Sequence, residues 1–142
     1  TKSLNTEQHQ KNVKTQNLFY VLADMSYSMD EYIPTFQVTR KGFTDAVVLA
    51  LLERVNDNKT KLYYRGFQGD VGSLHKALEH KDIKPLRDYI LNTGPGGGTN
   101  TANALRVAID DIAKARAGLN PDLPNMEKAE LLVISDAEDT ID

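Results

Sequence analysis

Two continuous apolar runs, each followed directly by an aspartate, limit the fold of this chain more than any other feature. Leu18–Ala23 (LFYVLA) leads into Asp24, and Leu131–Ser135 (LLVIS) leads into Asp136. A strand that is apolar on both faces is typical of a parallel sheet covered by helices on both sides. The runs therefore predict inner strands of one such sheet, with an aspartate at the carboxyl end of each.

The segments between these runs predict helices and a further strand. The expected elements are a helix over Phe43–Val55, a strand over Lys61–Phe67, a short helix over Asp82–Leu91 and a helix from about Thr101. Strands that alternate with helices are typical of α/β domains. We therefore predict a Rossmann-like fold, α/β, with a mainly parallel sheet flanked by helices.

Two of these helices carry an apolar stripe at helical spacing, which predicts the face that packs on the sheet. The first stripe consists of Phe43, Val47, Val48, Leu51, Leu52 and Val55. Asp45 belongs to the polar side of that helix. The stripe of the helix from Thr101 consists of Ala102, Leu105, Ile109 and Ile112.

Composition excludes several classes of function. With 142 residues the chain fits one domain. Its 17 basic and 20 acidic residues give a net charge of -3 without a basic cluster, which argues against a nucleic-acid partner. The longest purely apolar run, Ala46–Leu52, is too short to span a membrane, so no membrane partner is expected. The absence of cysteine is compatible with the cytoplasm, where we expect the protein to work.

The two ends of the chain differ from its middle. Thr1–Gln16 is polar and is interpreted as a tail or linker, with the domain occupying residues 17–142. The chain stops soon after Leu131–Ser135, where an α/β domain needs further elements. We therefore expect the C-terminal elements to be missing and a bare strand edge to be present beside this run.

Three polar clusters occupy places where a ligand of an α/β sheet is expected, just after a strand or just before a helix. They are Asp24, Ser26 and Ser28 after the first run, Thr99 after the glycine loop 94–98, and Asp136 after the second run. Two carboxylates and three hydroxyls form an oxygen-only set, which suits Mg²⁺, with Mn²⁺ or Ca²⁺ as alternatives, and does not suit Zn²⁺. Such a set leaves a cation under-neutralised and ready to accept a carboxylate from another molecule, which indicates binding rather than catalysis.

The three motifs together resemble the metal-ion-dependent adhesion site of von Willebrand factor type A (VWA) domains: D-x-S-x-S after a buried strand, Thr after a Gly pair, and Asp after a second strand. The resemblance covers Leu18 to about Asp142. It implies that Asp24, Ser26, Ser28, Thr99 and Asp136 surround a divalent cation directly or through water. It also implies a protein-binding module that is not an enzyme.

The sequence departs from the family pattern at two places in the motifs. Tyr27 stands where a small glycine is usual, so an aromatic contact is expected at the rim of the site. Ala137 and Glu138 follow Asp136 where a glycine is common, which leaves Asp139 as a substitute ligand. The stretches LLVISD and LYYRGF are similar to the intracellular bacterial branch that works with MoxR-type AAA+ ATPases. That similarity implies such an ATPase as the partner.

Other interpretations of the same residues stay open. The D-x-S-x-S stretch could be a turn that caps the following helix, Thr99 could be a helix N-cap, and Asp136 could be an ordinary strand-end residue. The loop GPGGGTN allows a nucleotide- or phosphate-binding α/β domain, although it lacks the Lys-Ser/Thr ending of a phosphate loop. The three histidines, among them His75, are expected to be solvated.

Enzyme classes that use an aspartate or a serine fit the motif poorly. An aspartyl phosphatase needs a second carboxylate where Ser26 stands, and a serine hydrolase needs glycines around Ser26 or Ser28 that the chain lacks. These missing groups are a second reason to expect a module that is not an enzyme.

Overall fold

A four-stranded sheet with strand order β5-β4-β1-β6 forms the centre of the computed structural model, which describes residues 17–57, 59–119 and 129–136. The strands are β1 (Asn17–Asp24), β4 (Thr60–Phe67), β5 (His75–Ala77) and β6 (Ala129–Ile134). β1 pairs in parallel with both β4 and β6, and β5 pairs antiparallel with β4. The expected mainly parallel sheet is confirmed.

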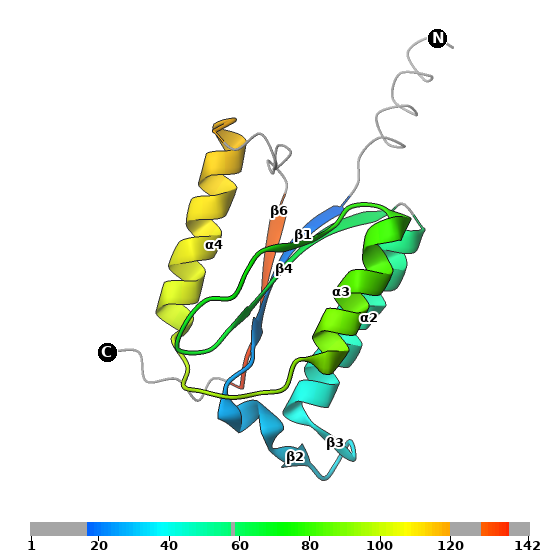
Figure 1. The fold of residues 1–142 in the computed structure, drawn as a ribbon, viewed down its shortest axis with the longest axis vertical. Helices are drawn as coiled ribbons and strands as arrows, with labels where there is room; N and C mark the ends of the chain where they lie inside the picture. Colours follow the sequence, from blue (N-terminus) through cyan, green and yellow to red (C-terminus); the bar gives the residue numbers. More distant parts are fainter. Residues whose placement is uncertain (1–16, 58, 120–128, 137–142) are drawn as a thin grey trace, which may run out of the picture.

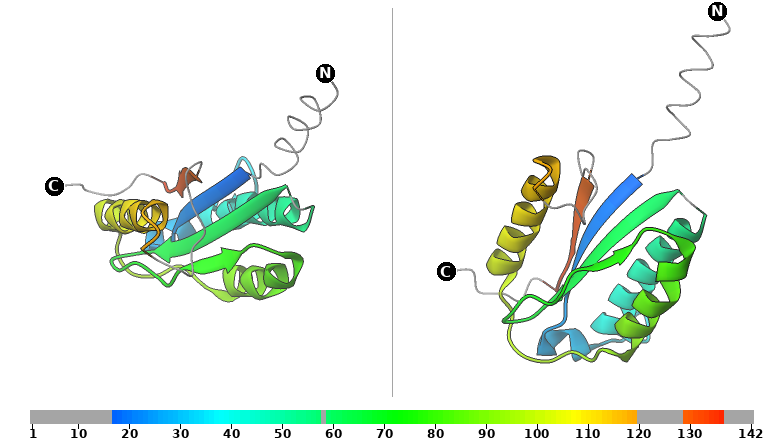
Figure 2. Two further views of the ribbon diagram at one scale, coloured as in Figure 1. Left: turned by 90° about the horizontal axis from the view of Figure 1, so that it is seen from above. Right: turned by 45° about the horizontal axis from the view of Figure 1, so that its top comes forward.

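Helices cover both faces of this sheet (Figure 1 and Figure 2). The helices α2 (Arg40–Asn56) and α3 (Ile83–Asn92) lie on one face, and α4 (Thr101–Arg116) lies on the other. The Thr39 side chain accepts a hydrogen bond of 3.0 Å from the Gly42 amide and so caps the start of α2. The expected α/β class, with helices flanking a mainly parallel sheet, is confirmed.

Shorter elements complete the described chain. The 3-10 turn η1 (Tyr27–Asp30) follows β1, and a second 3-10 turn, η2 (His80–Asp82), precedes α3. A small antiparallel hairpin of β2 (Tyr32–Ile33) and β3 (Val38–Thr39) leads into α2. Within the described residues, no helix is long and apolar enough to cross a membrane.

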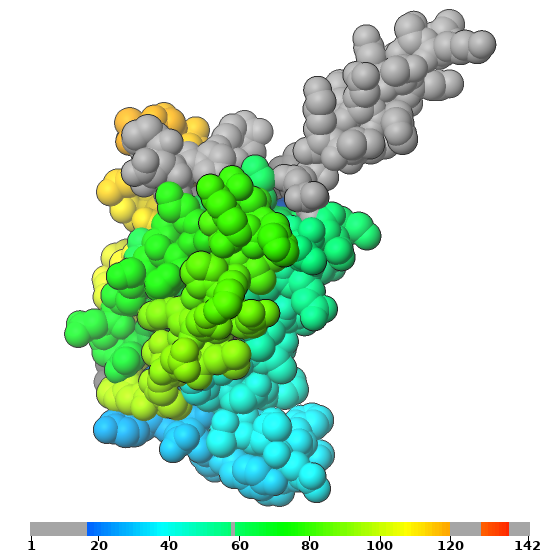
Figure 3. Space-filling view, turned by 45° about the vertical axis from the view of Figure 1, so that its right-hand side comes forward, coloured from blue at the N-terminus to red at the C-terminus, as the bar shows by residue number. Residues whose placement is uncertain are grey.

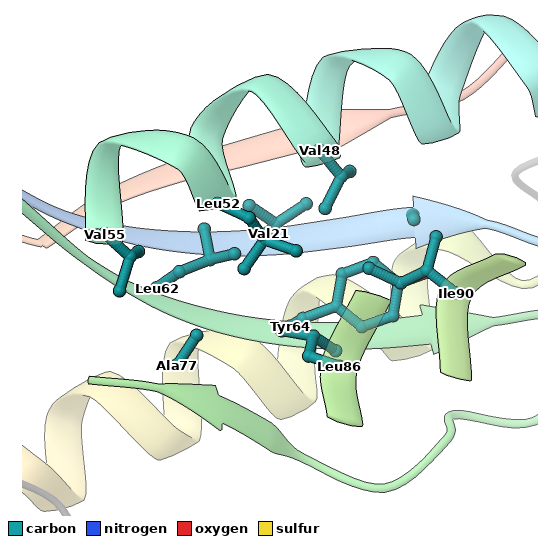
Figure 4. Close-up of a cluster of buried hydrophobic side chains, with 10 residues drawn as sticks. Val21, Val48, Leu52, Val55, Leu62, Tyr64, Ala77, Leu86 and Ile90 are labelled. Carbon is teal, nitrogen blue, oxygen red and sulfur yellow. The ribbon is translucent and has the colours of Figure 1, made fainter. Parts of the chain in front are cut away.

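The central strand β1 is buried because its side chains alternate between two cores. Tyr20 and Leu22 belong to the core under α4, whereas Val21 and Ala23 belong to the core under α2 and α3. Figure 4 shows the second core, with Val21 among side chains from α2, α3 and the neighbouring strands. The continuous apolar run LFYVLA thus reflects helices on both faces.

The buried face of α2 contains Val48, Leu52 and Val55 of the predicted stripe and differs from the prediction at two other positions. Phe43, assigned to the core, is 45% exposed, whereas Asp45, assigned to the polar side, is buried beside the Lys41 ammonium group. Burial raises the pKa of Asp45, and the hydrogen bond and charge of Lys41 oppose that rise. Apolar side chains surround much of this helix, so their spacing alone could not fix which face meets the sheet.

The buried face of α4 also differs from the predicted one. Ile109 is 59% exposed, and small residues face the sheet instead: Ala104, Ala108 and Ala115. The same core contains the large rings of Tyr20, Tyr63 and Phe67, and the α4 residues that are fully buried against it are small. The predicted stripe is therefore wrong at Ile109, although Leu105 and Ile112 do pack against this core.

His75 is the third correction, because it is not simply solvated. Its ring stacks on Tyr89 with centroids 4.1 Å apart, and its Nε2 atom is buried without a hydrogen-bond partner among the described residues. Burial, together with the charge of Arg65, lowers its pKa below the ordinary value.

The strand β6 is an edge strand of the described sheet. It pairs with β1, and its other edge has no partner strand among the described residues. Leu131 is 36% exposed, so the run LLVIS is not buried on both sides as an inner strand would be. The expected bare edge is present in this part of the chain. The proposed tail over residues 1–16 and the substitute ligand Asp139 lie outside the described residues.

Candidate functional site

The carboxyl ends of β1 and β6 bring the two predicted aspartates to one end of the sheet. Ala23 and Ile134 are paired in the sheet, so Asp24 and Asp136 follow at neighbouring strand ends. The Ser135 hydroxyl donates a hydrogen bond of 2.8 Å to Asp24 Oδ2 and connects the two strands. Sequence reasoning did not identify Ser135, although its place next to Asp136 was a usable signal.

Asp24 organises the D-x-S-x-S loop from a fully buried position. Its Oδ1 atom accepts hydrogen bonds from the Ser26 amide at 2.9 Å and from the Ser26 hydroxyl at 2.6 Å. The Ser26 and Ser28 hydroxyl oxygens lie 3.1 Å apart. The first three predicted site residues are therefore in mutual contact.

The helix-capping interpretation of this loop is wrong. Asp24 does close a turn through the Ser26 amide, but the cap of α2 is Thr39. Ser26 precedes η1 without making a side-chain cap hydrogen bond. The hydroxyls of Ser26 and Ser28 are therefore not needed as helix caps.

The glycine loop 94–98 is hydrogen-bonded to the same motif. The Gly96 amide donates to the Met25 carbonyl at 2.8 Å, and the Tyr27 amide donates to the Gly97 carbonyl at 3.2 Å. Thr99 follows this anchored loop and is half-buried. The backbone thus holds Thr99 at the end of the sheet that carries Asp24.

Thr99 is not the N-cap of α4. That position belongs to Asn100, whose side chain accepts a hydrogen bond of 3.0 Å from the Asn103 amide. The Asn100 amide in turn donates to the Gln68 carbonyl at 2.9 Å, which fixes the loop against the end of β4. The loop connects the two helices α3 and α4, so it lacks the strand-to-helix setting of a phosphate loop.

Asp136 is paired with a cation from α2. Arg40 Nη1 donates to Asp136 Oδ2 at 2.8 Å, and it lies 3.4 Å from the Ser28 carbonyl oxygen. Arg40 Nη2 also lies 3.4 Å from the exposed Glu31 carboxylate. Asp136 is therefore held against the start of α2, and its role at a metal site stays a prediction. Sequence reasoning did not identify Arg40 as a site residue. Its place at the start of the helix that follows the D-x-S-x-S loop could have indicated that it lies near the site.

Tyr27 lies between the two serines and points to solvent, with 73% of its surface exposed. An aromatic side chain therefore stands at the rim of this site. The expected aromatic contact with a partner stays a prediction.

The geometry of the hydroxyl pair fits an octahedral cation. Two neighbouring ligands of Mg²⁺, bound at right angles, lie about 2.9 Å apart. The Ser26 and Ser28 oxygens, at 3.1 Å, match this spacing. Ser26 gives its proton to Asp24, so Ser28 is the donor in the hydrogen bond between the two hydroxyls, and a bound cation would take the place of that shared proton. Asp136 is held by Arg40, so a contact through water fits it better than a direct bond.

A site rich in hydroxyls would not be found by counting ionisable ligands. No group of three or more His, Cys, Asp or Glu side chains that could hold a metal occurs in the described parts of the chain. Within those parts, the carboxylate and hydroxyl oxygens around Asp24 form a candidate site for a hard cation.

Neither a protein-family model nor a curated protein matches the chain. Solved structures do match, among them the following three. The conserved hypothetical protein BatB from Bacteroides thetaiotaomicron is 18% identical, with a TM-score of 0.51. The match covers 66% of this chain and 45% of the BatB chain. An aerotolerance-related membrane protein from Bacteroides fragilis is 18% identical, with a TM-score of 0.59. The match covers 89% of this chain and 57% of that protein's chain. An uncharacterised membrane-spanning protein from Vibrio fischeri is 18% identical, with a TM-score of 0.55. The match covers 72% of this chain and 52% of that protein's chain.

The fold is of the VWA type. At 18% identity, this similarity shows the VWA-type fold alone. The chain spans about half the length of each of these three structures.

Proposed function

We propose that this VWA-type chain is a metal-dependent protein-binding module. Asp24, Ser26 and Ser28 hold Mg²⁺, or Mn²⁺ or Ca²⁺ in its place, and Thr99 and Asp136 complete the site directly or through water. The observation that carries the proposal is the pair of serine hydroxyls 3.1 Å apart beside a buried carboxylate. Their oxygens have the spacing of adjacent ligands in a compact octahedral site.

Charge at the site favours an acidic partner. The carboxylates of Asp24 and Asp136 and the guanidinium of Arg40 leave one formal negative charge among these inner groups. A divalent cation makes them singly positive, and the exposed Glu31 contributes less because water screens it. A carboxylate from another protein then completes both the charge and the coordination.

We further propose that the module is not an enzyme. Proton transfer in hydrolysis uses a base close to the reacting group, most often a histidine. Among the described residues, the histidines lie on β5 and in η2, and β5 is at the opposite edge of the sheet from β6. The buried Asp24 carboxylate is instead occupied with three hydrogen bonds that shape the site.

The proposed partner and compartment rest on the sequence. The resemblance of LLVISD and LYYRGF to one bacterial branch supports a MoxR-type AAA+ ATPase as the partner. The lack of cysteine is compatible with the cytoplasm. Two of the similar structures are named as membrane proteins, so fractionation of cells that produce the native protein is the deciding measurement.

Two binding experiments test the proposed function. Calorimetric titration with Mg²⁺ and, separately, with ATP should show binding of the cation and none of the nucleotide. ATP binding without Mg²⁺ binding would favour the nucleotide-binding alternative. A pull-down of the MoxR-type ATPase should succeed in Mg²⁺ and fail in EDTA.

A further inference from the structure

Exposed apolar side chains gather next to the candidate metal site. Ten large hydrophobic residues are exposed in the described chain, and five of them fall within residues 27–43. We call these five the aromatic rim: Tyr27, Tyr32, Phe36, Val38 and Phe43. Exposed apolar side chains that gather in one region mark places where proteins bind one another.

The aromatic rim lies at the site end of the molecule. Figure 1 shows the β2–β3 hairpin beyond the end of the sheet that carries Asp24, and Figure 3 shows the same segment forming that end of the surface. The hairpin is anchored to the site, because the Arg40 amide donates to the Glu31 carbonyl at 2.9 Å. Phe36 at its turn packs against Phe43 of α2, with ring centroids 5.5 Å apart, while both rings stay exposed.

A cavity of about 300 Å³ continues from the rim into the site. Its apolar wall consists of Met29, Ile33, Phe43 and Ile134, and its polar wall consists of Arg40, Thr44, Ser135 and Asp136. Asp136 therefore belongs both to this cavity and to the proposed metal site. Arg40 stands where the two meet, with 25% of its side chain exposed.

We propose that the cavity takes a large apolar side chain of the partner segment whose carboxylate reaches the cation. The inference rests on the proposed function and adds the chemistry of the partner: an Asp or Glu followed or preceded closely by a bulky apolar residue. Positive charge from the cation and Arg40 attracts the acid, and the walls around Phe43 receive its apolar neighbour. Because acid and apolar side chain dock side by side, both must come from one short stretch of chain.

Peptide selection against the whole chain tests this inference. Random peptides displayed on phage are selected in Mg²⁺ on the immobilised protein, and the enriched peptides are synthesised. The inference predicts an acidic residue with a large apolar residue beside it. Phe43→Ser should weaken binding of these peptides by about tenfold or more, because burial of one aromatic side chain contributes about that factor. Ile109→Ser, which replaces another exposed apolar residue on the other face of the sheet, should leave binding unchanged. Unchanged melting temperatures would show that both variants fold.

The outcomes separate this inference from the proposed function. Acidic peptides that need Mg²⁺ but have no apolar neighbour would overturn the inference and leave the metal site intact. Acidic–apolar peptides that bind equally in EDTA and are weakened by Phe43→Ser would support the cavity and overturn the metal role. Failure to enrich any peptide would contradict both.

A membrane surface is the other occupant to test, since exposed aromatic rings also enter lipid. Sedimentation with vesicles of phosphatidylcholine and phosphatidylglycerol should show no binding. Vesicle binding that Phe36→Ser abolishes would overturn the inference.

Discussion

Arg40 and Asp136 form an ion pair of 2.8 Å, although 96 positions separate them in the chain. The guanidinium occupies the side of the candidate site that faces α2, and it also approaches the Ser28 carbonyl oxygen. A fixed positive charge so close to the proposed cation must influence its affinity.

The Arg40→Gln variant should bind Mg²⁺ more tightly. Removal of the positive charge lessens repulsion of the cation, and we expect about a threefold to tenfold gain at low salt. Isothermal titration calorimetry measures it, with Arg54→Gln at the exposed end of the same helix as the control. A loss of affinity in Arg40→Gln would instead mean that Arg40 orients Asp136 for the cation.

Replacement of Asp24 should affect stability as well as metal binding. Removal of a carboxylate from an exposed site would change the stability of the fold little. Asp24, however, is fully buried and accepts three hydrogen bonds. Asp24→Ala leaves the Ser26 amide and two hydroxyls without this acceptor, which should cost about 2–3 kcal/mol of unfolding free energy in EDTA. Urea denaturation measures the loss, and the exposed Asp110→Ala serves as the control. Equal stability of Asp24→Ala and wild type would contradict the buried arrangement.

Asp111 should contribute far more to stability than its neighbour Asp110. Arg65 donates to Asp111 Oδ2 at 2.8 Å, and the buried Tyr20 hydroxyl donates to the same carboxylate. Burial lowers the pKa of Arg65, but its hydrogen bonds to Asp111 and Tyr20 outweigh this and raise the pKa overall. Asp111→Ala therefore leaves the half-buried Arg65 guanidinium without its carboxylate partner.

We expect Asp111→Ala to cost about 2–4 kcal/mol, and Asp110→Ala, whose pair with Lys114 is exposed, to cost far less. Chemical denaturation of the two variants gives the comparison. Similar losses in both would show that the buried network does not hold α4 on the sheet.

Stability should fall as the pH drops below about 6.5, in part because of His75. Burial and the charge of Arg65 lower the pKa of His75 in the folded protein. In the window between that lowered pKa and about 6.5, the unfolded chain binds more protons than the folded one, so the contribution of His75 is complete above the window and is lost below it.

His75→Phe keeps an aromatic ring against Tyr89 and removes the titration, so its unfolding free energy should depend less on pH across this window. Denaturation at several pH values between 5 and about 7.5 measures the slope. A wild-type slope in His75→Phe would contradict this account.

The strands and the class of fold follow from local sequence, whereas some contacts of the site do not. LFYVLA and LLVIS are correctly predicted as strands because strands of a parallel sheet covered by helices are apolar, although only LFYVLA is an inner strand among the described residues. Arg40 and Ser135 were missed because periodicity within a segment says nothing about which distant side chain lies opposite. The face of α4 depended on the size of Tyr20 and its neighbours across the core. The spacing of apolar residues along α4 carries no information about the size of the side chains on the sheet that it packs against.

The most direct test of the central claim is a Mn²⁺ titration followed by nuclear magnetic resonance of the amide-labelled protein. Paramagnetic Mn²⁺ broadens the signals of nearby nuclei, so it locates a bound cation without any partner. We predict that amide signals of Ser26, Ser28, Thr99 and Asp136 disappear at substoichiometric Mn²⁺ and return when Mg²⁺ is added in excess. Broadening that is confined to other carboxylates, or signals at these four positions that survive a full equivalent of Mn²⁺, would contradict the account.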